Sequence, residues 1–85
     1  MPRITFTAHL RRWAPAGPVI VLGATVRLAL DAVFADYPTL RLYVLDEQRR
    51  LRKHVALFVD GTRATLDDAV PQDAEIHVLQ ALSGG

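Results

Sequence analysis

The chain has 85 residues, of which 51% are apolar and 22% charged, with a formal net charge of +1 and no cysteine. This composition excludes intrinsic disorder, and a chain this short leaves little room for an enclosed substrate pocket, which weighs against an independent enzyme. The lack of cysteine excludes a thiol nucleophile and a zinc-finger site and fits a reducing cytoplasm. The low net charge argues against nucleic acid as the main partner. No apolar run approaches the ~18 residues of a membrane span, and the first five residues lack a signal-peptide core.

The N-terminal third is expected to form two strands. Residues 3–8 alternate polar and apolar side chains, which predicts a strand with Ile4, Phe6 and Ala8 towards a core. Residues 9–18 are dense in proline and glycine and predict a loop. Residues 19–22 form a short β-branched run, so a second strand should follow and pair with the first as a hairpin.

One amphipathic helix is predicted over residues 25–37. Thr25 is a suitable N-cap, and the helix should end at Tyr37 because Pro38 disfavours helical geometry in the residue before it. After Thr25, apolar residues recur with the spacing of a single helical face. They are Val26, Leu30, Val33, Phe34 and Tyr37.

The second half of the chain is predicted to consist of strands joined by turns. Alternation predicts strands over residues 40–46 and 51–59, separated by a polar turn at 47–50. Asp60-Gly61 favours a tight turn, and residues 63–69 and 71–74 are expected to be short connections. A last strand over residues 75–82, with Ile76 and Val78 inward, should lead directly into Ser83-Gly84-Gly85.

These elements indicate an α+β fold in one domain over residues 1–85. A mixed sheet of four to five strands would pack on one main helix in two layers, and residues 81–85 would form a flexible functional tail. A terminal glycine pair is expected by chance in only about 0.5% of chains, because glycine makes up about 7% of residues. A frayed terminus is the plain explanation of this pair. The functional explanation is that two residues without a Cβ can pass through a narrow channel into a partner's active site.

The order of the elements, with Gly-Gly at the end, resembles the β-grasp (ubiquitin-like) fold. It is most similar to the MoaD/ThiS family of sulfur carrier proteins, which includes the small subunit of molybdopterin synthase. The matching segments are spread over the whole chain. They are Gly23-Ala24-Thr25-Val26 and Tyr37-Pro38 at the two ends of the helix, residues 54–61 as a hydrophobic strand with its turn, residues 73–78 as the turn into the last strand, and Leu82-Ser83-Gly84-Gly85.

The resemblance implies a carrier on which partner enzymes act, and not an enzyme. In the family, an E1-like adenylyltransferase/sulfurtransferase uses ATP to adenylate the terminal glycine, and a sulfur donor converts the adenylate into a thiocarboxylate. A sulfur-accepting biosynthetic enzyme of a molybdopterin-, thiamine-, cysteine- or thio-metabolite-type pathway then takes the sulfur. The carrier itself would bind no cofactor or metal and would act in the cytoplasm, without nucleic acid or membrane.

The same resemblance implies roles for six residues. Gly85 would be the reacting residue, with Ser83 and Gly84 completing the tail and Gly84 giving steric clearance. Leu82 would anchor the tail on the partner. Leu79 and Phe58 would extend that docking patch if they lie on the sheet face away from the helix; otherwise they are ordinary packing residues.

Two other functions are consistent with the same sequence. A ubiquitin-like modifier would be joined through Gly85 to a lysine after the same activation, and a non-covalent β-grasp interaction module would carry the glycine pair incidentally.

Among the remaining features, the basic run at Arg49, Arg50, Arg52, Lys53 and His54 is expected to be a solvated hairpin tip, with contact to phosphate or an acidic partner as the alternative. The acidic residues Asp67, Asp68, Asp73 and Glu75 are expected to be a solvated face or a docking patch for basic residues of the E1-like enzyme. Trp13 is expected to cap the edge of the core.

Overall fold

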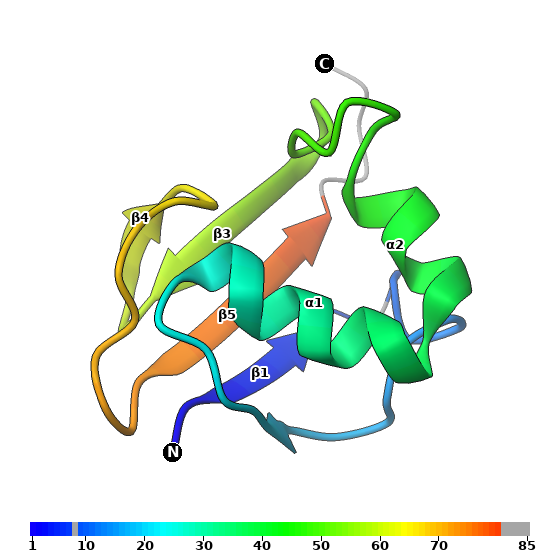
Figure 1. Cartoon of the computed structure of the whole chain (residues 1–85). Coiled ribbons are helices and arrows are strands. Elements are labelled where there is room, and N and C mark those ends of the chain that lie inside the picture. The colour runs from blue at the N-terminus through cyan, green and yellow to red at the C-terminus, as the bar shows by residue number, and fades with distance from the viewer. Residues whose placement is uncertain (8, 81–85) are drawn as a thin grey trace.

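The computed structural model describes residues 1–7 and 9–80 of the chain. Expectations for Ala8, Leu82, Ser83, Gly84 and Gly85 therefore lie outside the described residues. The elements in chain order (Figure 1) are β1 (Arg3–Phe6), β2 (Val19–Ile20), α1 (Val26–Asp36), α2 (Pro38–Val44), β3 (Val55–Val59), β4 (Thr62–Ala64) and β5 (Glu75–Gln80).

The five strands form one mixed sheet in the order β2-β1-β5-β3-β4. β5 is the central strand, parallel to β1 and antiparallel to β3, and the two edge strands pair antiparallel with their neighbours. Figure 1 shows α1 crossing one face of this sheet. The predicted α+β class, the mixed sheet and the hairpin of the first two strands are confirmed.

The core lies between the sheet and α1. Successive side chains of a strand point to opposite faces, and the predicted inward residues Ile4, Phe6, Ile76 and Val78 are at most 3% exposed. β3 likewise buries alternate residues from Val55 to Val59. No side chain of the described residues that is buried in this core is polar or charged, so burial of apolar area is the main stabilising term.

α1 forms largely as the sequence predicts. The Thr25 hydroxyl accepts a hydrogen bond from the backbone N–H of Leu28 and so caps the helix. Four residues of the predicted face are buried: Val26, Leu30, Val33 and Phe34. The prediction was wrong for Tyr37, which is 38% exposed and lies just beyond the last helical residue.

The loop before α1 passes very close to the helix. A Cβ added at Gly23 would lie 2.5 Å from the backbone nitrogen of Ala29 and 2.8 Å from its Cα. Such distances are far inside van der Waals contact, so a residue with a side chain fits here only if the backbone moves.

The second helix, α2, corrects the predicted strand over residues 40–46. Pro38 ends α1 and also begins α2, because at the first helical position its missing N–H leaves no hydrogen bond unmade. Leu40 and Val44 are fully buried, whereas Leu42 between them is 58% exposed. A strand would place all three on one face, and a helix places only the residues four apart together.

Four further boundaries differ from the prediction. The strand expected over residues 3–8 ends at Phe6. The strand expected over residues 51–59 begins only at Val55, because Leu51 pairs instead with Leu45 in an isolated bridge. The strand expected over residues 19–22 comprises Val19–Ile20. The expected connection at residues 63–69 begins with the end of β4, which pairs with β3 across the Asp60-Gly61 turn. Both turn residues have positive φ, 49° and 83°, as this turn type requires.

Candidate functional site

The candidate site begins where the described part of β5 ends, at Gln80. Val55 of β3 lies directly opposite Gln80. On the other side, the backbone N–H of Gln80 donates to the Thr7 hydroxyl at 3.3 Å, and the Thr7 N–H donates to the carbonyl of Val78 at 3.1 Å. The central strand is therefore held on both sides up to the residue from which the predicted tail, residues 81–85, continues in the sequence.

The predicted docking residues Phe58 and Leu79 lie on the sheet face away from α1. They alternate with buried residues of β3 and β5, and Leu79 is 37% exposed while Phe58 is half-buried. In the antiparallel register Phe58 faces His77 and Ala56 faces Leu79, so Phe58 and Leu79 are diagonal neighbours. The geometric condition for a shared docking patch is met, and their role in binding stays a prediction.

Charged side chains border this face. The Arg63 guanidinium lies 5.8 Å from the centroid of the Phe58 ring, within the range of a cation–π contact. At the start of β5, Glu75 pairs with Arg3 at 2.7 Å, and the Nε2 atom of His77 lies 3.9 Å from the Glu75 carboxylate. The surface around Phe58 is thus amphipathic and not uniformly apolar.

The basic run forms an ordered loop between α2 and β3. The Asp46 carboxylate accepts hydrogen bonds from the backbone N–H groups of Gln48 at 2.8 Å and Arg50 at 2.9 Å. The bond from the Arg50 backbone is the main cause that lowers the pKa of Asp46, and the Gln48 bond and the nearby Arg50 and Arg52 charges lower it further against an opposing effect of burial. Arg49 adopts a left-handed conformation with φ 62°. The expected hairpin tip is therefore a defined turn built around one carboxylate.

The acidic residues do not form one cluster. Asp67 pairs with Arg27 at 3.4 Å, and the Asp68 carboxylate accepts a hydrogen bond from the Thr65 N–H at 2.8 Å. Glu75 pairs with Arg3 as described above. Most of these carboxylates thus hold local structure, which sequence spacing alone does not reveal.

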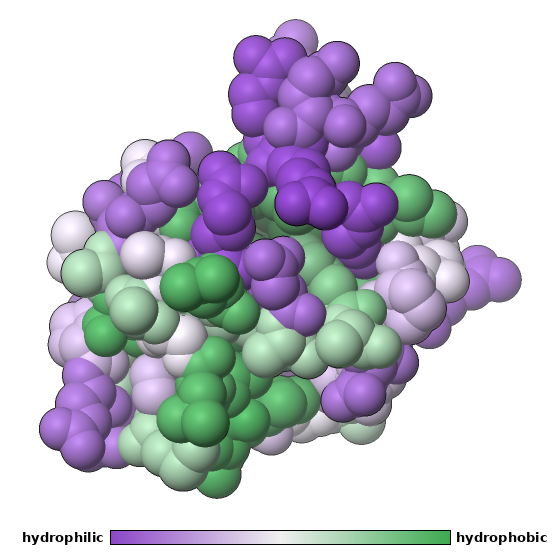
Figure 2. Space-filling view, in the orientation of Figure 1, coloured by the Kyte–Doolittle hydropathy of each residue, from purple (hydrophilic) through white to green (hydrophobic). Residues whose placement is uncertain are grey.

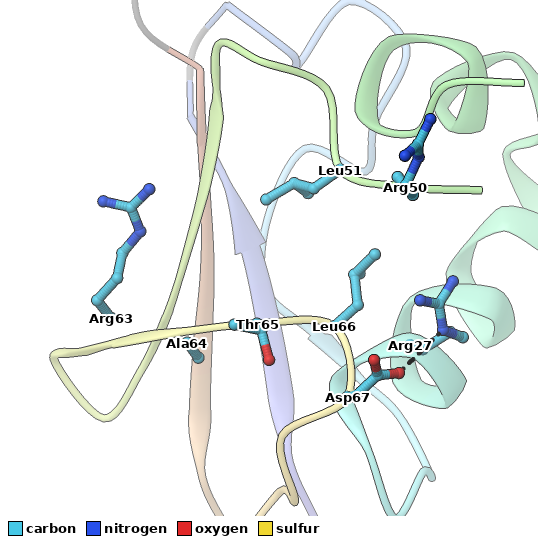
Figure 3. Close-up of a pocket in the computed structure, with 8 residues that line it drawn as sticks. All are labelled: Arg27, Arg50, Leu51, Arg63, Ala64, Thr65, Leu66 and Asp67. Carbon is cyan, nitrogen blue, oxygen red and sulfur yellow. Dashed lines mark hydrogen bonds and ion pairs between the residues drawn. The ribbon is translucent and has the colours of Figure 1, made fainter. Parts of the chain in front are cut away.

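A surface hollow of about 520 Å³ was not foreseen from the sequence (Figure 3). It lies between the start of α1, the basic loop and the turn after β4. Its lining residues are Arg27, Arg50, Leu51, Arg63, Ala64, Thr65, Leu66 and Asp67. Figure 3 shows Leu66 pointing towards Leu51 and Arg63 extending away from the other two arginines. The one carboxylate in the lining, Asp67, is already paired with Arg27, so the hollow holds no acid–base pair for catalysis.

Trp13 packs at the edge of the core, as expected, and makes an unexpected contact. Its ring stacks on Tyr43 of α2, with ring centroids 3.8 Å apart and an interplanar angle of 17°. Within residues 1–7 and 9–80, no group of three or more His, Asp or Glu side chains is arranged to hold a metal ion. No helix in that same part of the chain is long and apolar enough to cross a membrane.

Comparison with known proteins gives matches in structure. No protein-family model and no curated protein sequence matches the chain. SAMP1 from Haloferax volcanii is similar with a TM-score of 0.86 and 26% identity, over 99% of this chain and 98% of that one. The Amycolatopsis orientalis BexX/CysO complex gives a TM-score of 0.87 at 20% identity, over the full length of both chains. Mycobacterium tuberculosis CysO gives 0.84 at 17% identity, over 96% of this chain and all of that one.

The fold and these neighbours define a small ubiquitin-like (β-grasp) protein of the class that comprises sulfur carriers and protein modifiers. The resemblance to the MoaD/ThiS type of sulfur carrier is confirmed at the level of structure. Since the neighbours are small carrier proteins, the chain is placed with proteins on which partner enzymes act and not with enzymes.

Proposed function

We propose that the chain is a sulfur carrier protein whose Gly85 carboxylate is adenylated by an E1-like enzyme and then converted into a thiocarboxylate. The observation that carries this proposal is the likeness to CysO over the full length of the chain, combined with Gly84 and Gly85 four and five residues after the central strand. The fold supplies a rigid base, and the glycine pair supplies the reacting end.

The chemistry follows from the weakness of a carboxylate as an electrophile. The terminal carboxylate is ionised at neutral pH, so it must first be activated. A carboxylate oxygen of Gly85 attacks the α-phosphorus of ATP, and pyrophosphate leaves. A sulfide or persulfide sulfur then attacks the acyl carbon, and AMP leaves with the electron pair of the broken C–O bond. With a persulfide donor, a thiol cleaves the S–S bond, which leaves the thiocarboxylate and a disulfide.

The chain's own part in this chemistry is reach and fit. The five residues after Gln80 span at most about 18 Å when fully extended, enough to enter a channel in a partner. Gly84 offers no Cβ to the channel wall, Ser83 is a further small residue of the tail, and Leu82 is an apolar anchor. Leu79 and Phe58 extend the docking surface on the sheet.

The proposal assigns ATP and the sulfur donor to partner enzymes and no bound cofactor to the chain. The partners are an E1-like adenylyltransferase/sulfurtransferase and a sulfur-accepting biosynthetic enzyme. One neighbour, CysO, was solved in complex with BexX, which supports a mode of action through protein partners. The absence of cysteine favours a reducing cytoplasm as the place of action.

A second function, protein modification, is favoured by one observation. SAMP1 is small archaeal modifier protein 1, and a second structure of the H. volcanii protein is similar to this chain with 25% identity and a TM-score of 0.84. Both functions begin with adenylation of Gly85. They differ in whether sulfur or a lysine amine displaces AMP.

Intact-mass measurement separates these functions. The chain is incubated with ATP, a purified E1-like enzyme and a persulfide donor, and its mass is recorded. A gain equal to the exchange of one oxygen for sulfur supports sulfur carriage, and a ladder of larger conjugates supports modification. A variant that lacks Gly85 should show neither product. If the full chain forms no adenylate and the truncated chain retains its cellular function, both proposals are wrong.

A further inference from the structure

Two loops lie at the end of the sheet where the described part of β5 ends. β1 runs parallel to β5, so the loop that follows β1 starts beside Gln80. β3 runs antiparallel to β5, so the loop that precedes Val55 arrives beside Gln80 from the other side. These loops are far apart in the sequence, and the central position of β5 brings them to either side of the same strand end (Figure 1).

Both loops carry exposed cations. We define the basic rim as Arg11 and Arg12 in the first loop with Arg52 and Lys53 in the second, all four exposed to solvent. None of the four forms an ion pair with another residue of the described chain. The charges of Arg11, Arg12 and Lys53 are therefore available to a partner, whereas the Arg52 charge also acts on the Asp46 carboxylate. Figure 2 shows hydrophilic side chains gathered over the loop that joins α2 to β3.

α2 fixes the two halves of the rim in place. The ring next to Arg12, that of Trp13, stacks on Tyr43 of α2. The Nε atom of Arg52 donates to the carbonyl of Leu42 in the same helix at 2.6 Å. Because one helix holds both loops, the rim does not need to be ordered when a partner binds, which lowers the entropic cost of association.

The opposite end of the sheet carries carboxylates, and two of them are paired with cations, Asp73 with the N-terminal amino group and Glu75 with Arg3. Asp60 follows the last residue of β3, and Asp73 and Glu75 stand at the start of β5. The backbone N–H of Asp60 donates to the Glu75 carbonyl at 2.8 Å, which places these carboxylates together. The cations at that end are therefore used in ion pairs, whereas the four cations of the basic rim at the Gln80 end form none within the described residues.

We propose that the basic rim docks on an acidic surface that surrounds the channel of the enzyme that takes up residues 81–85. This inference rests on the proposed function. Cations without ion-pair partners beside Gln80 would orient the carrier during approach, with this end of the sheet towards an acidic partner surface. A nucleic-acid partner is disfavoured because Trp13, the aromatic ring beside the rim, is half-buried and already has one face stacked on Tyr43.

The test uses the full chain with a purified E1-like adenylating enzyme and ATP, and follows pyrophosphate release against carrier concentration. The rim variant combines Arg11→Glu with Lys53→Glu, because no side-chain contact of either residue holds the described fold together. We expect KM to rise about tenfold and kcat to stay unchanged, since exposed charges act on encounter and not on chemistry. The dependence of kcat/KM on ionic strength should also become weaker.

A charge-matched variant separates the rim from net charge. Adding Asp31→Lys and Asp36→Lys, both exposed on α1, to the rim variant restores a net charge of +1 while the rim stays reversed. We expect this fourfold variant to keep the raised KM, and the two α1 substitutions alone to leave KM unchanged. A wild-type KM in the rim variant, or recovery of KM in the fourfold variant, would overturn the inference.

The experiment gives one result if the proposed function is wrong and another if only this inference is wrong. If it is wrong, the wild-type chain releases no pyrophosphate at any carrier concentration, and the docking inference falls with it. If only the inference is wrong, the wild-type and rim variants react with equal KM. Rim-dependent binding to an RNA oligonucleotide that is tighter than binding to the enzyme would also overturn it.

Discussion

Trp13 stacks face to face on Tyr43 at a centroid distance of 3.8 Å and so joins the loop after β1 to α2. Stacked aromatic pairs are worth about 0.5–1.5 kcal/mol beyond the area that they bury. The two residues are 30 positions apart in the sequence, and neither lies in the sheet. Their contact is a long-range connection that the strand pairing does not provide.

A double-mutant cycle should detect this connection. We expect Trp13→Ala and Tyr43→Ala each to lower the free energy of unfolding, with a coupling of about 1 kcal/mol between them. Denaturant titration of the wild type, both single variants and the double variant gives this coupling energy. If the two effects simply add, the stacking contributes nothing beyond burial.

Gly23 should tolerate no side chain. Gly23→Ala places a Cβ 2.5 Å from the Ala29 backbone, and the shift that this forces should cost about 2 kcal/mol or more. Gly17→Ala is the matched control, because a Cβ there meets nothing within 4 Å. Thermal unfolding followed by circular dichroism compares the two. Equal melting temperatures would show that the loop at Gly23 does not pack against α1 as described.

Leucine truncation distinguishes a helix from a strand at residues 38–44. Leu40 is fully buried and Leu42 is 58% exposed, so Leu40→Ala should destabilise the fold by about 2–4 kcal/mol and Leu42→Ala by much less. A strand with its apolar residues inward would make the two losses similar. Urea midpoints of the two variants decide between these outcomes.

The pH dependence of Asp46 has a definite sign. Its pKa is lowered in the folded chain, mainly by the hydrogen bond from the Arg50 backbone, so ionised Asp46 stabilises the folded state above the pKa of the unfolded chain. That contribution is lost as the pH falls through the lowered pKa. Asp46→Asn keeps an acceptor oxygen but no charge. The wild type should therefore unfold at a higher temperature than this variant at pH 7, and the difference should shrink below the ordinary pKa of 3.8. A difference that grows on acidification would contradict the assignment.

Leu79 should contribute to recognition by the activating enzyme. Leu79→Arg places a charge on the sheet face beside Phe58, and we expect KM for adenylation to rise about tenfold with little change in unfolding temperature. Leu28→Arg is the control, since Leu28 is exposed on α1 and lies outside the proposed docking surface. Equal KM values for the two variants would remove Leu79 from the site.

The sequence was sufficient to predict those helices and strands whose apolar residues fit only one of the two periods, helical or strand. Val26 to Phe34 follow only a helical period, and Val55 to Val59 only a strand period, and both were predicted with their buried faces. Leu40 and Val44 satisfy both periods, and Pro38 fits the end of one helix as well as the start of the next. Exposed Leu42 resolves that ambiguity only once the tertiary packing is known.

Some features of the candidate site could likewise be predicted from the sequence, and others could not. The placement of Phe58 and Leu79 on the outer sheet face followed from alternation, because each flanks buried residues in its own strand. The placement of Arg11 and Lys53 at the same end of the sheet did not follow from alternation. It depends on β1 and β3 pairing with opposite sides of β5, a long-range choice on which local sequence patterns carry no information.

The central position of β5 also has a mechanical consequence. An enzyme that draws residues 81–85 into its channel pulls β5 along its own axis, between two strands that are hydrogen-bonded to it on either side. Such a force loads two ladders of hydrogen bonds in shear at once, whereas an edge strand pulled along its axis would load only one. A pull on the chain beyond Gln80 is therefore resisted by both neighbouring strands.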